Sequence, residues 1–371
     1  MYYLGVDGGG TKTSFAIIDK NGNLLGKAKT TTCHHGQVGF NGLEDILNQG
    51  IAESCRMAGI TPKSLTYSYL GIPGYGENKA EQEEIEIRIG NILGRGSFQC
   101  GNDVEAGWAG SLACEPGISV IAGTGAISFG KNAQGETARS SGWGHYCGDE
   151  GSAHWIGKKA IEVFSKQADG RIDKSELYNI VRTRFDLEAD FDLIQIVISE
   201  LQMDRGKIAQ ISRLVHEAAE KGDRSAQKIF QEAAEEIYLM IEAVYNKISF
   251  DGLESCSDES VDNEDADESS KESIKELSKE SAKVSKKIPL SYAGGVFNAG
   301  KYILNPLKEK LQERLPRLEM MAPVFEPVIG SALNALIIHG KKNDDKRQKL
   351  DIATVVRRLK VQMPTKNEYC E

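Results

Sequence analysis

The sequence has no cysteine pair with C-x-x-C spacing and no apolar run long enough to cross a membrane. Its seven cysteines are odd in number and scattered over 371 residues, so we expect reduced thiols rather than zinc ligands or disulfide bonds. No basic and apolar leader precedes the first expected strand. These absences predict a cytoplasmic protein.

The sequence also has fewer positive than negative side chains. The chain has 45 lysines and arginines against 54 aspartates and glutamates, which gives a formal net charge of −9. Nucleic acids and anionic membranes repel such a chain at long range. We therefore expect neither as a partner, and we expect any phosphate ligand to be held by local groups.

Neither common nucleotide-binding motif is present. A Walker A loop needs Gly-Lys-Ser/Thr leading into a helix, but Gly10 is followed by Thr11 and then by an apolar strand. No G-x-G-x-x-G segment fits a dinucleotide-binding turn. The chain has instead two glycine turns, at residues 7–13 (DGGGTKT) and 122–126 (AGTGA), and each joins two apolar strands.

These turns are candidate phosphate clamps. Glycine allows backbone N–H groups to converge on an anion, and threonine adds hydroxyl donors. A single glycine turn is usually explained by the needs of the turn itself. Two such turns with threonine at the tip favour phosphate binding. The candidates are Asp7, Gly9, Gly10, Thr11, Lys12, Thr13, Gly123, Thr124 and Gly125. We expect Asp7 to hold Mg²⁺ through water.

A third glycine element follows an expected strand near residues 290–293 and precedes a helix. Its candidates are Gly294, Gly295 and Asn298, whose backbone could pass close under a flat ring or a ribose. Alone this signal is weak. With two phosphate clamps, it matches what a nucleotide needs.

Asp103 lies between an expected strand and an expected helix. One interpretation is a turn or helix N-cap residue, because Asn-Asp is common there. The other is a general base that accepts a proton from an attacking hydroxyl. Both remain open at this point.

The densest polar stretch is residues 142–152 (GWGHYCGDEGS). Its glycines bring the backbone close to a ligand, and its carboxylates can accept hydrogen bonds from sugar-like hydroxyls. Asp149 and Glu150 also suit the N-terminus of the next helix, which is the alternative explanation. The ligand-binding candidates are Gly142, Trp143, Gly144, His145, Tyr146 and Asp149.

The order of expected elements suggests a duplicated α/β domain. An antiparallel meander followed by helices and further strands occurs twice. We expect lobes at residues 1–115 and 116–340, with an acidic, serine-rich and disordered insert at 251–287 and a basic tail at 341–371 that holds a loosely attached helix.

In chain order, the DGGGTKT, GND, AGTG, GWGH with GDEGS, and AGGVF segments resemble the BadF/BadG/BcrA/BcrD-type ATPase family, and within it the N-acetylglucosamine kinase group. The resemblance covers about residues 2–340 without the insert. It implies an α/β, actin-like ATPase fold of the sugar kinase, Hsp70 and actin type. Such a fold has two RNase H-like lobes, with ATP and Mg²⁺ bound in the cleft between them.

The resemblance also implies roles for individual residues. Gly9, Gly10, Thr11 and Thr124 would hold phosphates, and Gly294, Gly295 and Asn298 would lie beside the adenosine. Asp103 would accept the proton of the sugar 6-hydroxyl, while residues 142–146 and Asp149 would line the sugar pocket. The implied partners are ATP and an amino sugar such as N-acetylglucosamine, and a homodimer is left open.

Two departures leave the acceptor sugar open. Ala126-Ile127 stands where animal N-acetylglucosamine kinases usually carry Ser-Asn, and His34 stands where a substrate-loop Asn is usual. Glucosamine, another amino sugar or a muropeptide-derived sugar would also fit a pocket without those polar groups.

The alternative function within the family is an activator ATPase of 2-hydroxyacyl-CoA dehydratases or benzoyl-CoA reductases. Such proteins hold an iron–sulfur cluster through a cysteine near the second clamp, where this chain has Val120. The next cysteine along the chain is Cys147, so a cluster lacks its ligand. A sugar-sensing regulator is a third class, but the N-terminus has no room for a DNA-binding segment.

Overall fold

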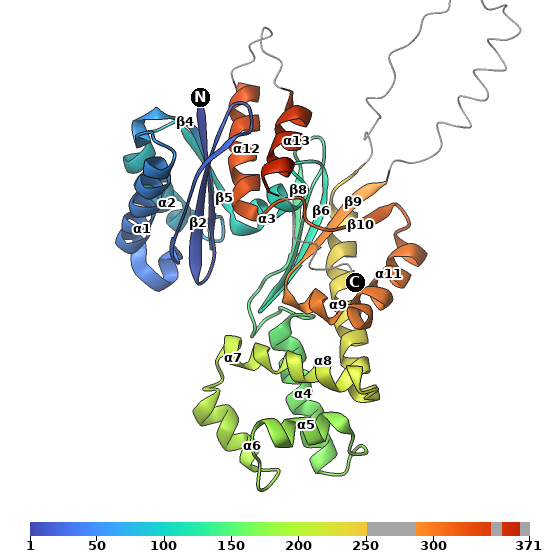
Figure 1. Cartoon of the computed structure of the whole chain (residues 1–371). Coiled ribbons are helices and arrows are strands. Elements are labelled where there is room, and N and C mark those ends of the chain that lie inside the picture. Colours follow the sequence, from blue (N-terminus) through green and yellow to red (C-terminus); the bar gives the residue numbers. More distant parts are fainter. Residues whose placement is uncertain (251–286, 343–350, 364–371) are drawn as a thin grey trace, which may run out of the picture.

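The computed structural model describes residues 1–250, 287–342 and 351–363. It contains two five-stranded sheets, each covered by helices (Figure 1). The expected acidic insert lies outside the described residues except for Lys287, and so does much of the expected basic tail.

The first sheet has the strand order β3-β2-β1-β4-β5. The first three strands form an antiparallel meander, whereas β4 and β5 run parallel to β1. The elements of this part are β1 (Tyr2–Gly8), β2 (Lys12–Asp19), β3 (Leu24–Thr31), α1 (His35–Met57), η1 (Pro62–Ser64), β4 (Leu65–Ile72), α2 (Lys79–Leu93), β5 (Phe98–Asn102) and α3 (Asp103–Ser111).

Alternation along the strands explains how this sheet is covered on both faces. Leu4 and Val6 of β1 pack into a core with α1 and α2, whereas Tyr3 packs into a second core with α12 (Pro327–Lys342) and α13 (Ile352–Gln362). Successive side chains of a strand point to opposite faces, so both faces are buried. Figure 1 shows α1 and α2 on one side of the sheet and α12 and α13 on the other.

The second sheet has the order β10-β9-β6-β7-β8, which repeats the first. Again three antiparallel strands are followed by two strands that run parallel to the first of them. The remaining strands are β6 (Gly117–Ala122), β7 (Ala126–Lys131), β8 (Thr137–Ser141), β9 (Ile288–Ala293) and β10 (Leu318–Met321). The repeated order confirms the predicted duplicated α/β unit.

A group of helices between β8 and β9 extends from the second sheet (Figure 1). The helices of this lobe are α4 (Ala153–Ala168), α5 (Glu176–Arg184), α6 (Asp192–Gln195), a π-helical turn η2 (Ile196–Glu200), α7 (Arg205–Gln210), α8 (Ser212–Glu220), α9 (Arg224–Lys247), the 3₁₀ helix η3 (Gly295–Ala299) and α11 (Lys301–Arg314). These helices agree with those expected after the second meander. None of the described helices is long and apolar enough to cross a membrane.

Two C-terminal helices differ from the expected lobe division. We expected residues 116–340 to form the second lobe, but α12 packs on the first sheet, where Ile329, Leu333 and Leu336 are fully buried. We expected a loosely attached helix in the tail, but α13 buries Val355 and Leu359 in the same core. Both helices cover the apolar face of β1 that α1 and α2 leave open. We therefore propose that the first lobe combines residues 1–115 with these two helices.

Candidate active site

The first glycine turn joins β1 to β2 and is held from behind. The Gly9 N–H donates to the Lys12 carbonyl at 2.8 Å. The carbonyl groups of Gly9 and Gly10 accept hydrogen bonds from Thr32 Oγ1 (2.7 Å) and Gln37 Nε2 (3.1 Å). Gly10, Thr11 and Lys12 are exposed at the tip. The tip is thus fixed and open to solvent, as an anion-binding turn requires.

Thr13 is not available to a ligand. Its side chain is fully buried, its hydroxyl donates to the Thr31 carbonyl at 2.9 Å, and it accepts from the Cys33 N–H at 3.0 Å. The expectation that Thr13 contacts phosphate is therefore wrong. Because Thr13 lies on the inward face of β2, its hydroxyl connects β2 to β3 and to the segment after β3.

Asp7 and Asp103 come together at the edge of the first sheet. Asp7 lies near the end of β1 and pairs with Gly71 of β4, and a Cβ at Gly71 would lie 3.4 Å from the Asp103 Cα. Asp103 is the first residue of α3, directly after β5. The carboxyl ends of neighbouring parallel strands meet at one edge, which explains why residues almost a hundred positions apart lie close together.

Both carboxyl groups titrate abnormally. The pKa of Asp7 is raised to about 7, chiefly by burial and then by the negative charge of Asp103, while Lys12 opposes the shift. Burial raises the pKa of Asp103 to about 6 against the hydrogen bonds from the N–H groups of Val104 and Asp103 itself. Two coupled carboxylates with raised pKa values in a cleft are typical of a functional site.

The N-cap of α3 is Asn102 and not Asp103. The Asn102 side chain accepts a hydrogen bond from the Val104 N–H at 3.3 Å and donates to the Tyr75 carbonyl at 3.1 Å. This decides one part of the question that the sequence left open. Asp103 is not needed as the cap, and it lines a cleft.

The second glycine turn lies between two cavities. Gly123 and Thr124 line a cavity of 370 Å³ together with Gly295 and Asn298. Gly125 lines a larger cavity of 860 Å³, which also contains Asp103. Residues of the expected phosphate clamp therefore line both cavities.

The smaller cavity brings the second and third glycine elements together. Gly294 has a φ of +110°, and a Cβ at this position would overlap the Ala122 carbonyl. Only glycine allows η3 to approach the second turn so closely. The structure thus brings Gly123 and Thr124 together with Gly295 and Asn298 around one cavity.

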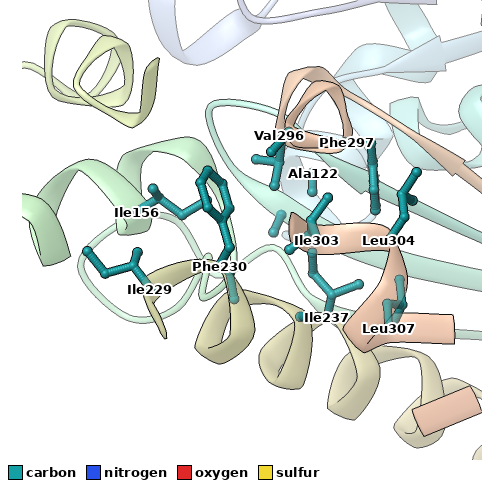
Figure 2. Close-up of a cluster of buried hydrophobic side chains, with 14 of the residues drawn as sticks. Ala122, Ile156, Ile229, Phe230, Ile237, Val296, Phe297, Ile303, Leu304 and Leu307 are labelled. Carbon is teal, nitrogen blue, oxygen red and sulfur yellow. The ribbon is translucent and has the colours of Figure 1, made fainter. Parts of the chain in front are cut away.

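An apolar core supports this cavity from below. Figure 2 shows Ile156 of α4 beside Phe230 of α9, with Val296 and Phe297 of η3 above Ile303. Ile156, Phe230 and Val296 also line the cavity. Its wall is therefore partly apolar, which suits the face of an aromatic ring.

Two side chains of α8 complete the smaller cavity, and the sequence analysis missed both. Arg213 and His216 line it, and the ring of His216 contacts Phe230 and Tyr302 edge-on, with centroid distances of 6.3 and 6.0 Å. These residues lie about ninety positions from the second turn within an amphipathic helix. Nothing in their spacing distinguishes them from ordinary surface residues.

The larger cavity is lined from both lobes. The first lobe contributes Glu77, Asn102 and Asp103, among others. The second lobe contributes Gly125, Ala126, Ile127, Arg139, Gly142, Trp143, Gly144, Asp149, Arg205 and Lys247. Charged groups of both signs and an indole ring thus face one space, as in sites that bind polar ligands such as sugars.

The polar stretch after β8 enters this cavity only in part. Gly142 and Gly144 adopt positive φ values of 75° and 80°, and Trp143 between them is 76% exposed. His145 and Tyr146 do not line the cavity, and their rings lie 4.1 Å apart at the surface. The structure therefore brings three of the five residues 142–146 to this cavity.

Asp149 is buried but faces the same cavity. Its side chain is 3% exposed, and its Oδ2 accepts a hydrogen bond from Arg205 Nη2 at 2.7 Å. The backbone at Asp149 has a φ of +61°, which is uncommon for a residue other than glycine. Arg205 was not a candidate from the sequence, because it lies on a helix 56 positions away.

His34 was expected to bind the substrate, because it stands at the position of the substrate-loop Asn, but the structure gives it another contact. It is the N-cap of α1, and its Nδ1 accepts a hydrogen bond from the Gly36 N–H at 3.0 Å. It lines neither of the two cavities described above. A helix-capping role explains this side chain in the structure.

An ion pair spans the larger cavity. Arg139 Nη1 of β8 lies 3.6 Å from Glu77 Oε1, in the loop between β4 and α2. The side chains are 37% and 55% exposed. Since the two residues belong to different lobes, this contact bridges the cleft.

Comparisons with known proteins identify the family of the chain. The model of the BadF/BadG/BcrA/BcrD ATPase family matches residues 4–256. The chain is 28% identical over 334 residues to an N-acetylmuramic acid/N-acetylglucosamine kinase of Clostridium acetobutylicum, which covers 90% of this chain and 98% of the relative. It is also 28% identical over 346 residues to an N-acetyl-D-glucosamine kinase of Dictyostelium discoideum, which covers 90% of this chain and 97% of that protein.

A solved structure extends the comparison to the fold. A proposed N-acetylglucosamine kinase from Chromobacterium violaceum matches with a TM-score of 0.62 at 21% identity, covering 90% of this chain and 98% of the other. At this identity the likeness concerns the fold alone. Together with the repeated strand order, it confirms the predicted two-lobed, actin-like α/β fold.

Proposed function

Because the chain belongs to the BadF/BadG/BcrA/BcrD ATPase family, we propose that it is an ATP-dependent kinase of N-acetylglucosamine or a related amino sugar. The curated relatives named as kinases of N-acetylglucosamine match along almost their whole length, which supports this choice within the family. The observation that carries the proposal is the second glycine turn, which lines both the smaller cavity and a cleft containing the half-buried Asp103.

In this proposal the smaller cavity binds the adenosine of ATP. Gly294 and Gly295 bring the backbone close to the nucleoside, Asn298 offers a side-chain amide, and the apolar wall receives the ring. The phosphates run from Gly123 and Thr124 toward the tip of the first turn, where Gly10 and Thr11 supply N–H groups; the expected contribution of Gly9 is wrong, because its N–H is bound to the Lys12 carbonyl. Lys12, exposed beside them, adds a positive charge.

The larger cavity binds the sugar, with its 6-hydroxyl directed at Asp103. The Asp103 carboxylate accepts the hydroxyl proton as the sugar oxygen bonds to the γ-phosphorus of ATP. The bond between that phosphorus and the β–γ bridging oxygen breaks, and ADP leaves. A pKa of about 6 suits this role, because the group is deprotonated at neutral pH yet more basic than an ordinary carboxylate.

Asp7 fits a magnesium ion held through water. Among the described residues, no group of three His, Cys, Asp or Glu side chains could hold a metal ion. Mg²⁺ usually keeps several waters and uses one or two carboxylates together with substrate phosphates, so Asp7 suffices. When bound, the ion would neutralise phosphate charge, and it would also offset the cost of burying Asp7 beside Asp103.

The acceptor within the amino-sugar class depends on the wall of the larger cavity. Ala126 and Ile127 line it, so this wall is apolar at the positions where Ser-Asn is usual in animal N-acetylglucosamine kinases. We propose N-acetylglucosamine as the first acceptor to test. Glucosamine and N-acetylmuramic acid remain as alternatives, since a wall without hydrogen-bond partners discriminates weakly.

The activator ATPase alternative is not supported. Val120, at the position of the expected cluster cysteine, is fully buried in β6 and pairs with Ser128 and Tyr292. A side chain packed in the sheet is not placed to ligate a cluster shared between subunits. Cys147, the next cysteine along the chain, is exposed on the loop before α4.

The test is an assay with a panel of acceptors. The purified protein is incubated with ATP, Mg²⁺ and one of N-acetylglucosamine, glucosamine, N-acetylmannosamine, N-acetylmuramic acid or glucose. ADP release and sugar phosphate are then measured, the latter by mass spectrometry. Stoichiometric ADP and phosphorylated amino sugar support the proposal. ADP release without sugar phosphate would overturn it in favour of an ATPase that acts on another partner.

A further inference from the structure

Arg205 lies over the second glycine turn from a distant helix. It is the first residue of α7, whose N-cap is Asp204. A Cβ at Gly125 would overlap the Arg205 guanidinium, so this group sits directly on the turn. Glycine at position 125 therefore serves two purposes, because it forms the turn and makes room for the arginine.

A buried carboxylate holds this arginine. Asp149 Oδ2 accepts from Arg205 Nη2 at 2.7 Å, and a Cβ at Gly125 would also lie 2.8 Å from Asp149 Oδ2. The Asp149 side chain is 3% exposed, whereas that of Arg205 is 40% exposed. Burying a carboxylate is costly unless it is paired, so the pair fixes the arginine from below.

The guanidinium keeps unused hydrogen-bonding capacity. Arg205 Nε is buried and has no hydrogen-bond partner among the described residues. Its Nη2 is bound to Asp149, and the side chain lines the larger cavity. Because the side chain is 40% exposed and lines the cavity, the guanidinium has donors beyond the one bound to Asp149 with which to receive an anion there.

The position of Arg205 matches the path of a transferred group. Gly123 and Thr124 lie on the nucleotide side of the turn, while Gly125, Arg205 and Asp103 lie on the sugar side. If the proposed function holds, the γ-phosphoryl group crosses the turn at Gly125. Negative charge on its oxygens then develops beside the guanidinium.

We propose that Arg205 is a catalytic residue that binds the phosphoryl group during transfer, and that Asp149 is its positioning residue. This inference rests on the proposed kinase function. Arg205 stays protonated throughout and donates hydrogen bonds to the oxygens of the phosphoryl group, while the proton of the sugar hydroxyl goes to Asp103. Arginine suits this task because its planar fork binds phosphate oxygens in pairs.

The competing explanation is that Arg205 only neutralises the buried Asp149. A lysine at position 205 distinguishes the two, because it keeps the positive charge but loses the fork. Arg205→Lys and Arg205→Met are compared with Arg56→Met, whose arginine pairs with Glu53 on the surface of α1 and lines neither cavity. Circular dichroism and ADP affinity show whether each variant is folded.

We expect kcat to fall about 10²–10³-fold in both Arg205 variants, as for loss of one donor to a developing charge. KM for the sugar and affinity for ADP should change less than about threefold, and Arg56→Met should match the wild type. If Arg205→Met fails to fold, Arg205→Lys carries the test alone. If the folded Arg205→Lys keeps kcat within about twofold of the wild type, the inference is wrong.

A binding measurement tests the same point without turnover. Calorimetry compares ADP with ADP plus aluminium fluoride, Mg²⁺ and N-acetylglucosamine, since aluminium fluoride mimics a phosphoryl group in transfer. The wild type should bind ADP more tightly with aluminium fluoride, and both Arg205 variants should lose this gain. An equal gain in the variants would overturn the inference. A wild type that phosphorylates no sugar would instead overturn the proposed function, and the arginine assignment with it.

Discussion

Gly110 of α3 and Gly330 of α12 lie backbone against backbone within the proposed first lobe. A Cβ at Gly330 would overlap the Gly110 amide, and a Cβ at Gly110 would lie 2.7 Å from the Glu326 carbonyl oxygen. Beside them, the N–H groups of Val324 and Phe325 donate to the carbonyls of α3 at 3.0 Å. The chain returns from the second sheet to the first at this contact, which packs α12 against α3.

Gly330→Ala should therefore destabilise the protein. The added methyl group must push α3 and α12 apart, which we expect to lower the free energy of unfolding by about 1–3 kcal/mol. Urea unfolding measures this. Gly90→Ala in α2 is the matched control, because a Cβ there meets nothing nearer than 3.6 Å. That change should stabilise by about 0.5–1 kcal/mol, since alanine is the better helix former. Equal effects at both sites would contradict the close contact.

Asp103→Asn should abolish most turnover while leaving nucleotide affinity unchanged. The amide cannot accept the hydroxyl proton, so we expect kcat to fall about 10²–10⁴-fold. Initial rates and ADP titrations measure the two quantities. Glu105→Gln is the control, because Glu105 also lies in the first turn of α3 but accepts a hydrogen bond from Tyr69 OH at 3.0 Å. Near-normal turnover in Asp103→Asn would show that this carboxyl is not the base.

The pH dependence of kcat/KM should have an acidic limb near pH 6. Burial raises the pKa of Asp103 to about 6, so the base is lost at a higher pH than an ordinary carboxylate would be. Measured for the sugar at saturating ATP and Mg²⁺, where the bound ion would keep Asp7 ionised despite its pKa of about 7, activity should fall as the pH drops through about 6 and level off above it. The residual activity of Asp103→Asn should not show this limb. A limb near pH 4 in the wild type would mean that Asp103 has an ordinary pKa.

The ion pair across the cleft provides two opposite shifts of this limb. Glu77 raises the pKa of Asp103 and Arg139 lowers it. Glu77→Gln should therefore move the limb to lower pH, and Arg139→Gln should move it to higher pH. Both shifts should shrink in high salt, because the side chains are partly exposed. Shifts in the same direction would contradict the geometry.

The same pair should add little stability. At 3.6 Å and with both side chains more than a third exposed, it should contribute less than about 1 kcal/mol. Urea unfolding of the Glu77→Gln and Arg139→Gln variants and of the double variant measures this contribution. A coupling free energy well above that value would mean that the cleft is held shut by this contact.

Much of the fold was predictable because it depends on local patterns. Apolar strands of period two joined by glycine turns predicted both meanders, and their repetition predicted the duplicated domain. What failed was the course of the chain after β10. Leu333 of α12 and Leu359 of α13 belong to apolar helix faces that could pack on any open sheet face. The sequence therefore did not show that these helices cover the first sheet.

The site residues also divide into those that a local sequence pattern predicts and those that depend on how distant elements pack. Glycine turns can be recognised in the sequence, because Gly10, Gly125 and Gly294 occur in patterns that few other structures require. The prediction that Thr13 contacts phosphate was wrong because a threonine beside such a turn can face either way. Alternation along β2 directs its side chain inward. Arg205 was missed because contact with Gly125 depends on how α7 is placed against the turn, and no local pattern encodes that.

The central claim is that this cleft transfers a phosphoryl group from ATP to the 6-hydroxyl of an amino sugar near Asp103. The most direct measurement is ³¹P and ¹H NMR of the product formed from ATP, Mg²⁺ and N-acetylglucosamine. The account predicts one phosphate ester whose phosphorus couples to the two protons on C6. A product phosphorylated at C1 or elsewhere, or the formation of free phosphate alone, would contradict it.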